Sequence, residues 1–341
     1  MNMGYIMSQE SFDAMLDELL STYRIWAPVN KVGEGRHTDT DVVRYDFVSS
    51  VKEIEWEKKS DYAFKEILTP LSQTLFFFTE DEVKEANRDV KDVLVFLRSC
   101  DMHALKRQDN IYLHNGKERD YFYDQMRQHV HFVLMGCSHS YQECFCVDMG
   151  SNQTKDGYVF SFDIIDGNIH SDVKDETFNN VFKKYASQEK DVTPQYVTEN
   201  DVHVTIPNEI PLSIYKSDMW DEYKTRCIGC GRCNFVCPTC TCYTMQDIYY
   251  TDNGKVGERR RVCASCMVDG YTNVAGGGQY RRDQGERMRF KVLHKVYDHR
   301  QRFGYDMCVG CGRCTDVCPE YISMAAAINK LNKTVEELKN E

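Results

Sequence analysis

The chain has 341 residues, of which 42% are hydrophobic and 28% charged, as in a soluble globular protein of two or three domains. Its formal net charge of −11 argues against a nucleic acid as the partner. The start of the chain lacks the basic and apolar regions of a signal peptide, and the longest apolar runs are too short to span a bilayer. We therefore expect a cytoplasmic protein without a membrane span.

The first half of the chain predicts alternating helices and strands. Apolar residues at helical spacing indicate an amphipathic helix within residues 11–23. Continuous apolar runs at 74–79, 92–97 and 129–136 are typical of short buried strands. These elements together favour a mixed α/β domain.

A hairpin and a helix follow. Residues 158–170 contain an Asp-Gly pair at 166–167, which is a preferred two-residue hairpin turn. The next segment, 175–186, predicts a helix. Both extend the α/β pattern.

A proline-containing segment at 205–218 predicts a linker, so the chain divides after residue 215. Residues 1–215 form the N-terminal α/β domain of this prediction. Residues 216–341 form a mostly α-helical, ferredoxin-like domain, with helices expected at 285–303 and at the C-terminus. The predicted fold class is α+β.

Sixteen cysteines are unusual for such a chain, and twelve of them lie after residue 215. Disulfides are disfavoured in a reducing compartment. The remaining explanations are metal thiolates, reactive thiols or small buried side chains. The spacing of the cysteines distinguishes among them.

Two near copies of one motif carry eight of these cysteines: "CIGCGRCNFVCP" at 227–238 and "CVGCGRCTDVCP" at 308–319. The C-x2-C-x2-C-x3-C-P spacing is that of bacterial ferredoxins, in which three cysteines bind one 4Fe–4S cluster and the fourth binds the other cluster. Zinc prefers separated C-x2-C pairs and fits this repeat poorly. The predicted ligands are Cys227, Cys230, Cys233 and Cys318 for the first cluster, and Cys308, Cys311, Cys314 and Cys237 for the second.

Two cysteines of the first domain directly follow predicted strands. Cys100 comes after the run at 92–97, and Cys137 after the run at 129–136. If these strands are parallel neighbours, both thiols lie at the carboxyl edge of the sheet, where α/β folds bind ligands.

Cys144 and Cys146 follow in the sequence "CFC". With the two strand-end cysteines they make four thiolates, the number that a third 4Fe–4S cluster needs. Buried, unliganded cysteines are the simpler alternative. Asp101 and His103 are alternative ligands or neighbours of such a site.

Four further cysteines stand outside these sets: Cys240, Cys242, Cys263 and Cys266. They form an additional cluster or a zinc site, or they pack against the cages. One of them replacing a cage ligand is a further alternative, and Cys237 is the position most open to replacement.

No catalytic residues can be assigned. The sequence has no G-x-G-x-x-G motif after a strand and no P-loop. Metal cages without a substrate-binding signature favour a subunit that carries electrons for other proteins. A zinc-stabilised interaction module and a self-sufficient reductase with an organic cofactor are the competing hypotheses.

Four segments together carry a family resemblance: "CIGCGRCNFVCPTCTC", "CVGCGRCTDVCP", "RSCDMHALKRQD" and "MGCSHSYQECFC". Over roughly residues 70–325 the chain resembles the iron–sulfur electron-transfer subunit of anaerobic sulfite reductase, and also the beta subunits of sulfhydrogenases. The first resemblance implies a complex in which a flavin subunit oxidises NADH, this chain relays electrons, and a sirohaem subunit reduces sulfite. The second implies the same relay role in a nickel–iron hydrogenase complex.

Overall fold

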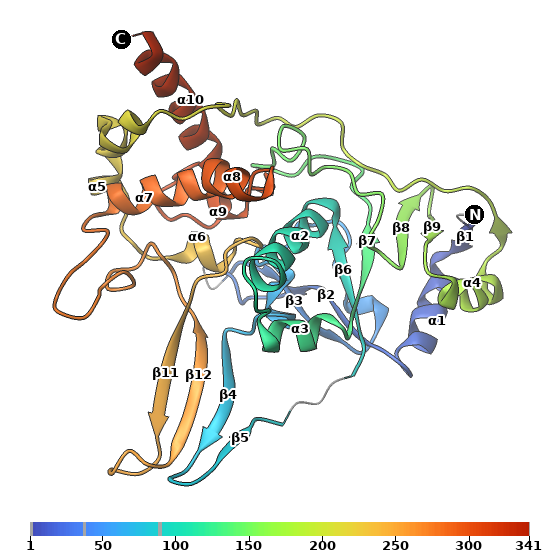
Figure 1. Cartoon of the computed structure of the whole chain (residues 1–341). Helices are drawn as coiled ribbons and strands as arrows, with labels where there is room; N and C mark the ends of the chain where they lie inside the picture. The colour runs from blue at the N-terminus through green and yellow to red at the C-terminus, as the bar shows by residue number, and fades with distance from the viewer. Residues whose placement is uncertain (1–2, 37–38, 88–90, 341) are drawn as a thin grey trace.

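An eight-stranded mixed sheet forms the centre of the first half of the chain (Figure 1). The computed structural model describes residues 3–36, 39–87 and 91–340. The strand order is β10-β1-β9-β8-β7-β6-β2-β3. Strands β2, β6, β7 and β8 run parallel, and the outer strands pair antiparallel. The strands are β1 (Met3–Ser8), β2 (Arg24–Lys31), β3 (Val42–Val48), β6 (Val93–Arg98), β7 (Val130–Met135), β8 (Phe160–Ile165), β9 (Asn168–Val173) and β10 (Gln188–Glu189).

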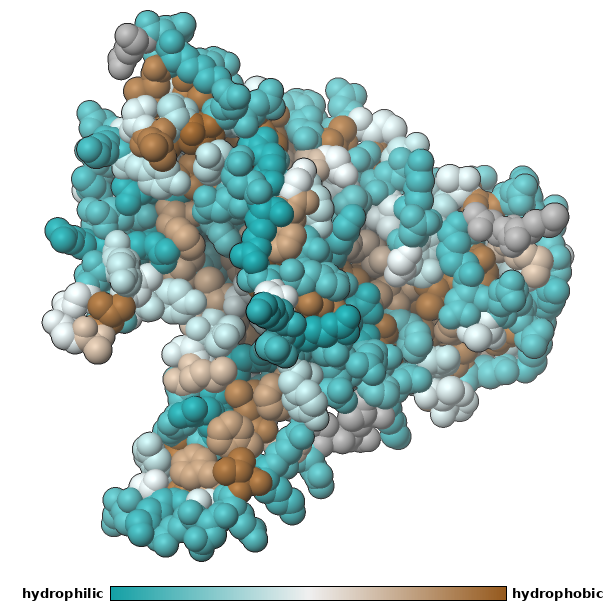
Figure 2. All heavy atoms as spheres, viewed as in Figure 1, coloured by the Kyte–Doolittle hydropathy of each residue, from teal (hydrophilic) through white to brown (hydrophobic). Residues whose placement is uncertain are grey.

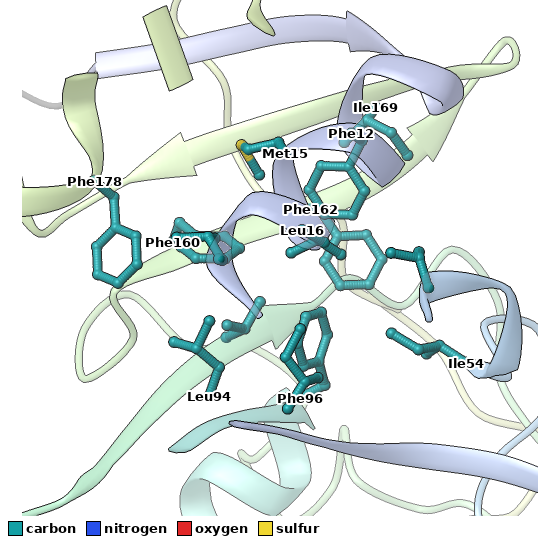
Figure 3. Packing of buried hydrophobic residues seen from close by; sticks show 14 of the residues in the cluster. Phe12, Met15, Leu16, Ile54, Leu94, Phe96, Phe160, Phe162, Ile169 and Phe178 are labelled. Atoms are coloured by element: carbon teal, nitrogen blue, oxygen red, sulfur yellow. The ribbon is translucent and has the colours of Figure 1, made fainter. Parts of the chain in front are cut away.

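Helices cover both faces of this sheet. On one face, α1 (Gln9–Leu19) and α4 (Asn179–Tyr185) pack together. Phe12 and Leu16 of α1 lie with Phe96 and Phe162 of the sheet in one hydrophobic core (Figure 3). On the other face, α2 (Ser99–Leu113) and α3 (Tyr121–Arg127) cover a second buried cluster.

Several predictions for this half are confirmed. The predicted helix is α1, and the runs at 92–97 and 129–136 are the buried, parallel neighbours β6 and β7. The hairpin turns at Asp166 (φ 50°) and Gly167 (φ 78°), between β8 and β9. Both central residues have positive φ, as the tight turns of two-residue hairpins require.

The run at 74–79 forms a strand, but its predicted burial is wrong. The strand is β4 (Ser72–Phe78), and only Leu75 of it is buried. It belongs to a second sheet, ordered β11-β12-β4-β5, which projects from the body as an arm (Figure 1). The other strands of the arm are β5 (Val83–Glu85), β11 (Tyr243–Tyr249) and β12 (Gly257–Cys263).

The arm joins strands from both sides of residue 215, because β12 pairs with β4. Hydrophobic residues are visible on the surface of this arm (Figure 2). Met245 and Tyr249 of β11 are among its exposed side chains. One sheet thus contains strands from both sides of residue 215. The division of the chain at that residue stays a prediction.

The rest of the second half is helical, as predicted. The predicted helix at 285–303 is one continuous rod made of α7 (Gln284–Leu293), a π-helical turn (His294–Asp298) and α8 (His299–Phe303). Its buried Met288, Val292 and Val296 join a third core cluster. The other helices are α5 (Glu222–Arg226), α6 (Arg232–Phe235), α9 (Arg313–Asp316) and α10 (Met324–Asn340).

Short 3₁₀ helices occupy connecting segments. They are Val51–Glu53, Phe64–Ile67, Glu176–Phe178, Leu212–Lys216 and Asp218–Trp220. Within the described ranges, every helix is too short or too polar to cross a membrane.

Candidate metal centres

The two cysteine loops share one backbone conformation and lie against each other. Gly231 (φ 75°) and Gly312 (φ 73°) adopt the left-handed backbone conformation and cap the N-termini of the short helices α6 and α9. These two helices contact each other. Glycine adopts the left-handed conformation without steric cost, so the repeat needs it at this position in both copies.

The second loop also rests directly on a loop of the first domain. A Cβ atom on Gly310 would lie 2.5 Å from the carbonyl oxygen of Phe145, and one on Gly312 would lie 2.3 Å from that of Glu143. The Phe145 amide donates a hydrogen bond to the Gly310 carbonyl at 2.8 Å. Only glycine allows so close an approach.

One cavity collects the four cysteines predicted for the first cluster. Cys227, Cys230, Cys233 and Cys318 all line it, and so does Cys314 of the second predicted set. Because Cys318 belongs to the second loop, the folded chain brings it close to the cysteines of the first loop, as crossed ligation requires. Their ligation of a cluster stays a prediction.

The cysteines of the second predicted set interact with one another. Burial raises the pKa of Cys308 to about 12 and that of Cys311 to about 11, and the nearby Cys237 adds to both shifts. Cys314 interacts with the same thiol. A hydrogen bond from Cys240 holds the pKa of Cys237 well below its usual range, which favours a thiolate there.

Cys100 and Cys137 lie at the carboxyl edge of the central sheet, as expected for parallel neighbours. Strands β6 and β7 end side by side, with Arg98 opposite Met135. Cys100 lies in the first turn of α2, and Cys137 follows β7. The Arg98 guanidinium donates to the Cys137 sulfur at 3.6 Å.

Cys144 and Cys146 complete this third set. Burial raises the pKa of Cys146 to about 12, and the nearby thiols of Cys144 and Cys137 add to the shift. Cys100 interacts with Cys146 in the same way. The Cys144 thiol also donates to the Cys311 carbonyl at 3.6 Å, so the third set adjoins the second cage.

Asp101 and His103, the alternative ligands, are engaged elsewhere. Asp101 is fully buried and binds the Arg313 guanidinium through both carboxylate oxygens. His103 shares a 2.9 Å hydrogen bond between its Nε2 and the Gln153 carbonyl. The four cysteines are therefore the better ligand set.

Two buried lysines lie among the thiols of the cages. Although burial opposes its charge, Cys233 raises the pKa of Lys291, and Cys237 does the same for Lys295. In the described part of the chain, neither ammonium has a carboxylate within ion-pair distance. A buried cation needs a counter-charge, which thiolates bound to a cluster would supply.

Two more lysines reach the cysteine loops from the first domain. The Lys59 ammonium donates to the Cys311 carbonyl at 3.1 Å and lies 3.8 Å from the Cys144 sulfur. The buried Lys65 donates to the Cys240 carbonyl at 2.9 Å. Lys59 is also paired with Asp316 at 2.7 Å, whereas Lys65 brings positive charge to a region rich in cysteine.

Sequence reasoning missed all four lysines, because lysine is normally a surface residue. A signal was present for two of them. Lys291 and Lys295 are four residues apart, among the buried Met288 and Val292 of the same helix. A lysine pair within an apolar helical stripe indicates a buried counter-charge.

The donor sets fit 4Fe–4S clusters. Thiolates from several directions, glycine loops and buried cations suit an anionic cubane. In the described ranges, no three His, Cys, Asp or Glu side chains are arranged to hold a single metal ion. A cubane holds its thiolates farther apart than one ion does.

The remaining four cysteines do not form one group. Cys240, Cys242 and Cys266 line a further cavity, whereas Cys263 lines a separate hollow.

Comparisons with known proteins agree with these cages. Residues 226–322 match the family model of a 4Fe-4S dicluster domain. The chain is 28% identical over 357 residues to sulfhydrogenase 2 subunit beta of Pyrococcus furiosus, covering 97% of this chain and 99% of that relative. No solved structure matches.

The match to the dicluster family model and the positions of the cysteine sets both indicate 4Fe–4S clusters. The dicluster domain coincides with the paired loops, and the similarity to the relative extends over both halves of the chain. This protein therefore carries two or more 4Fe–4S clusters, and it is similar over 97% of its chain to a protein named as a sulfhydrogenase beta subunit.

Proposed function

We propose that the chain is the electron-relay subunit of a sulfhydrogenase-type nickel–iron hydrogenase complex. The full-length similarity to a protein named as a sulfhydrogenase subunit is the observation that carries this proposal. The resemblance of the sequence motifs favours a sulfite reductase complex over a hydrogenase complex. The full-length similarity favours the reverse order.

In this proposal three sets of cysteines bind three 4Fe–4S clusters, each of which takes up and releases one electron. The first and second sets follow the crossed pattern, in which each loop lends its last cysteine to the other. The sets are Cys227, Cys230, Cys233 and Cys318; Cys308, Cys311, Cys314 and Cys237; and Cys100, Cys137, Cys144 and Cys146.

Contacts between the sets support a continuous relay. Helices α6 and α9 bring the two loops together. The Cys144 sulfur lies 3.6 Å from the Cys311 carbonyl oxygen, so the third set lies against the second loop. Cys230 is exposed, so the first set lies near the surface, where a partner can exchange electrons.

The buried lysines have a defined task in such a relay. A fixed positive charge stabilises the more negative, reduced form of a nearby centre. Lys291 and Lys295 are buried against the cages, where water cannot screen their charges. They would raise the reduction potentials of the clusters.

Anaerobic co-purification tests the proposal. The tagged chain is isolated from its native cells, and the partners are identified by mass spectrometry and metal analysis. We expect a nickel-containing partner, and hydrogen should reduce the clusters of the complex. A sirohaem partner together with sulfite-dependent reoxidation would instead support the sulfite reductase hypothesis.

A further inference from the structure

Three cysteines outside the cages share one cavity. Cys240, Cys242 and Cys266 line a cavity of about 240 Å³ beside the first loop. The Asn234 side chain donates to the Cys266 sulfur at 3.1 Å. Cys242 and Cys266 lie close enough to hydrogen-bond. The three sulfur atoms therefore gather around one cavity.

Cys263 does not belong to this group, although it lies three residues before Cys266. It pairs with Tyr243 across the β11–β12 hairpin, and the Ala264 amide donates to the Cys242 carbonyl. Directly opposed residues share a face of the sheet, and consecutive residues point to opposite faces. Cys263 therefore shares a face with Tyr243 and lines a separate hollow, although its thiol is near enough to Cys242 for the two to interact.

A histidine completes the cavity wall. His294 lines it and begins the π-helical turn of the rod. Single π-helical turns are rare and occur often at functional sites. The imidazole stacks on Phe290, with ring centroids 5.3 Å apart. A neutral imidazole binds iron and zinc, so the cavity presents three sulfur ligands and one nitrogen ligand.

The charges around the cavity favour an anionic occupant. Lys291 and Lys295 also line it, and both are buried. The Lys295 ammonium donates to the Thr239 hydroxyl at 2.7 Å, which fixes it in place. A metal–thiolate cluster carries net negative charge and matches these cations, whereas a free cation would be repelled.

We propose that Cys240, Cys242, Cys266 and His294 hold an additional iron–sulfur cluster, distinct from those of the two cages and of the third set. Cys240 lies beside Cys237, so this cluster would adjoin the second cage. The size of the cavity favours a cluster over a single ion, and no three of these side chains are placed for one ion in the described structure. The inference deepens the proposed relay, because it adds a centre beside the first loop.

The test compares the full-length protein, purified anaerobically in its complex, with two variants. Cys266→Ser should lower the iron and acid-labile sulfide content by about four atoms each per chain, and one spectroscopic cluster component should disappear. Cys263→Ser is the matched control and should keep both. Iron content unchanged by Cys266→Ser, or zinc lost in place of iron, would overturn the inference.

A second measurement covers the case in which Cys266→Ser does not fold. Pulsed EPR of the reduced wild-type protein should show a strongly coupled nitrogen on one cluster. His294→Cys should remove that coupling and retain the iron. A coupling that persists in this variant would exclude His294 as the ligand. The proposed relay would fail separately, through the absence of a hydrogenase partner.

Discussion

Arg313 and Asp101 form a fully buried ion pair that joins the two halves of the chain. The Nη1–Oδ1 distance is 2.6 Å and the Nη2–Oδ2 distance is 2.8 Å. Arg313 lies between Cys311 and Cys314 of the second cage, and Asp101 follows Cys100 of the third set. The pair therefore fixes the position of one set relative to the other.

Asp101→Ala should lower the free energy of unfolding by about 3–5 kcal/mol, because it leaves the Arg313 charge buried without a partner. Urea unfolding of the anaerobically purified protein, followed by circular dichroism, measures this. The exposed pair Lys224–Asp221 provides the control. Asp221→Ala should cost less than about 1 kcal/mol, and an equal cost in both variants would contradict the prediction.

Crossed ligation predicts which variants share a defect. Cys318→Ser should lose the same EPR component as Cys227→Ser, and Cys237→Ser the same component as Cys308→Ser. Each should lose about four irons, or convert its cluster to a three-iron form, because each set supplies one cluster. If Cys237→Ser instead resembles Cys227→Ser, each loop binds its own cluster and the crossing is wrong.

Lys291→Met should lower the reduction potential of the nearest cluster. A unit charge at about 6 Å with an effective dielectric constant of about 20 contributes about 3 kcal/mol, on the order of 100 mV for one electron. Redox titration monitored by EPR measures the potential. Lys333→Met changes an exposed lysine and should leave the potential unchanged; equal shifts would show that net charge alone is responsible.

Gly312→Ala should prevent assembly of the second cluster. The added Cβ would lie 2.3 Å from the Glu143 carbonyl, and φ is already left-handed. Gly304 has a similar φ of 83°, but a Cβ added there would have no atom within 4 Å. Gly304→Ala should therefore lower the free energy of unfolding only by the cost of a left-handed alanine, about 1–2 kcal/mol. Iron content and thermal unfolding distinguish the two, and full iron in Gly312→Ala would contradict the prediction.

Asp163 should make the stability of the protein depend on pH. Burial raises its pKa to about 7, against opposing contributions from the Gln195 amide and Arg98. Because the folded state then holds a proton that the unfolded state releases, stability from this group falls as pH rises from about 4 to about 7. Above that range it is constant.

Asp163→Asn should remove this dependence, which amounts to at most about 4 kcal/mol. Urea unfolding between pH 5 and pH 8 measures the difference in free energy of unfolding between wild type and variant. The lower limit lies roughly two pH units below the raised pKa of Asp163, so the measurement covers the upper part of the pH range in which stability changes. A constant difference between the two proteins would contradict the prediction.

Local pattern was sufficient for several elements and insufficient for others. The continuous apolar runs of β6 and β7 predicted buried strands, and the Asp-Gly pair predicted the turn between β8 and β9. The equally apolar β4 lies in the exposed arm instead. An apolar run shows that a strand forms, but the segments that cover it come from elsewhere in the chain.

The spacing of the cysteines determined by itself that this protein carries 4Fe–4S cages, because a short loop fixes which thiolates can converge. The tertiary structure decided which groups surround them. It buried Lys291 and Lys295 among the thiols, paired Asp101 with Arg313, and placed Cys263 on a different cavity from Cys240, Cys242 and Cys266. These outcomes depend on contacts between residues far apart in the chain, which no local spacing encodes.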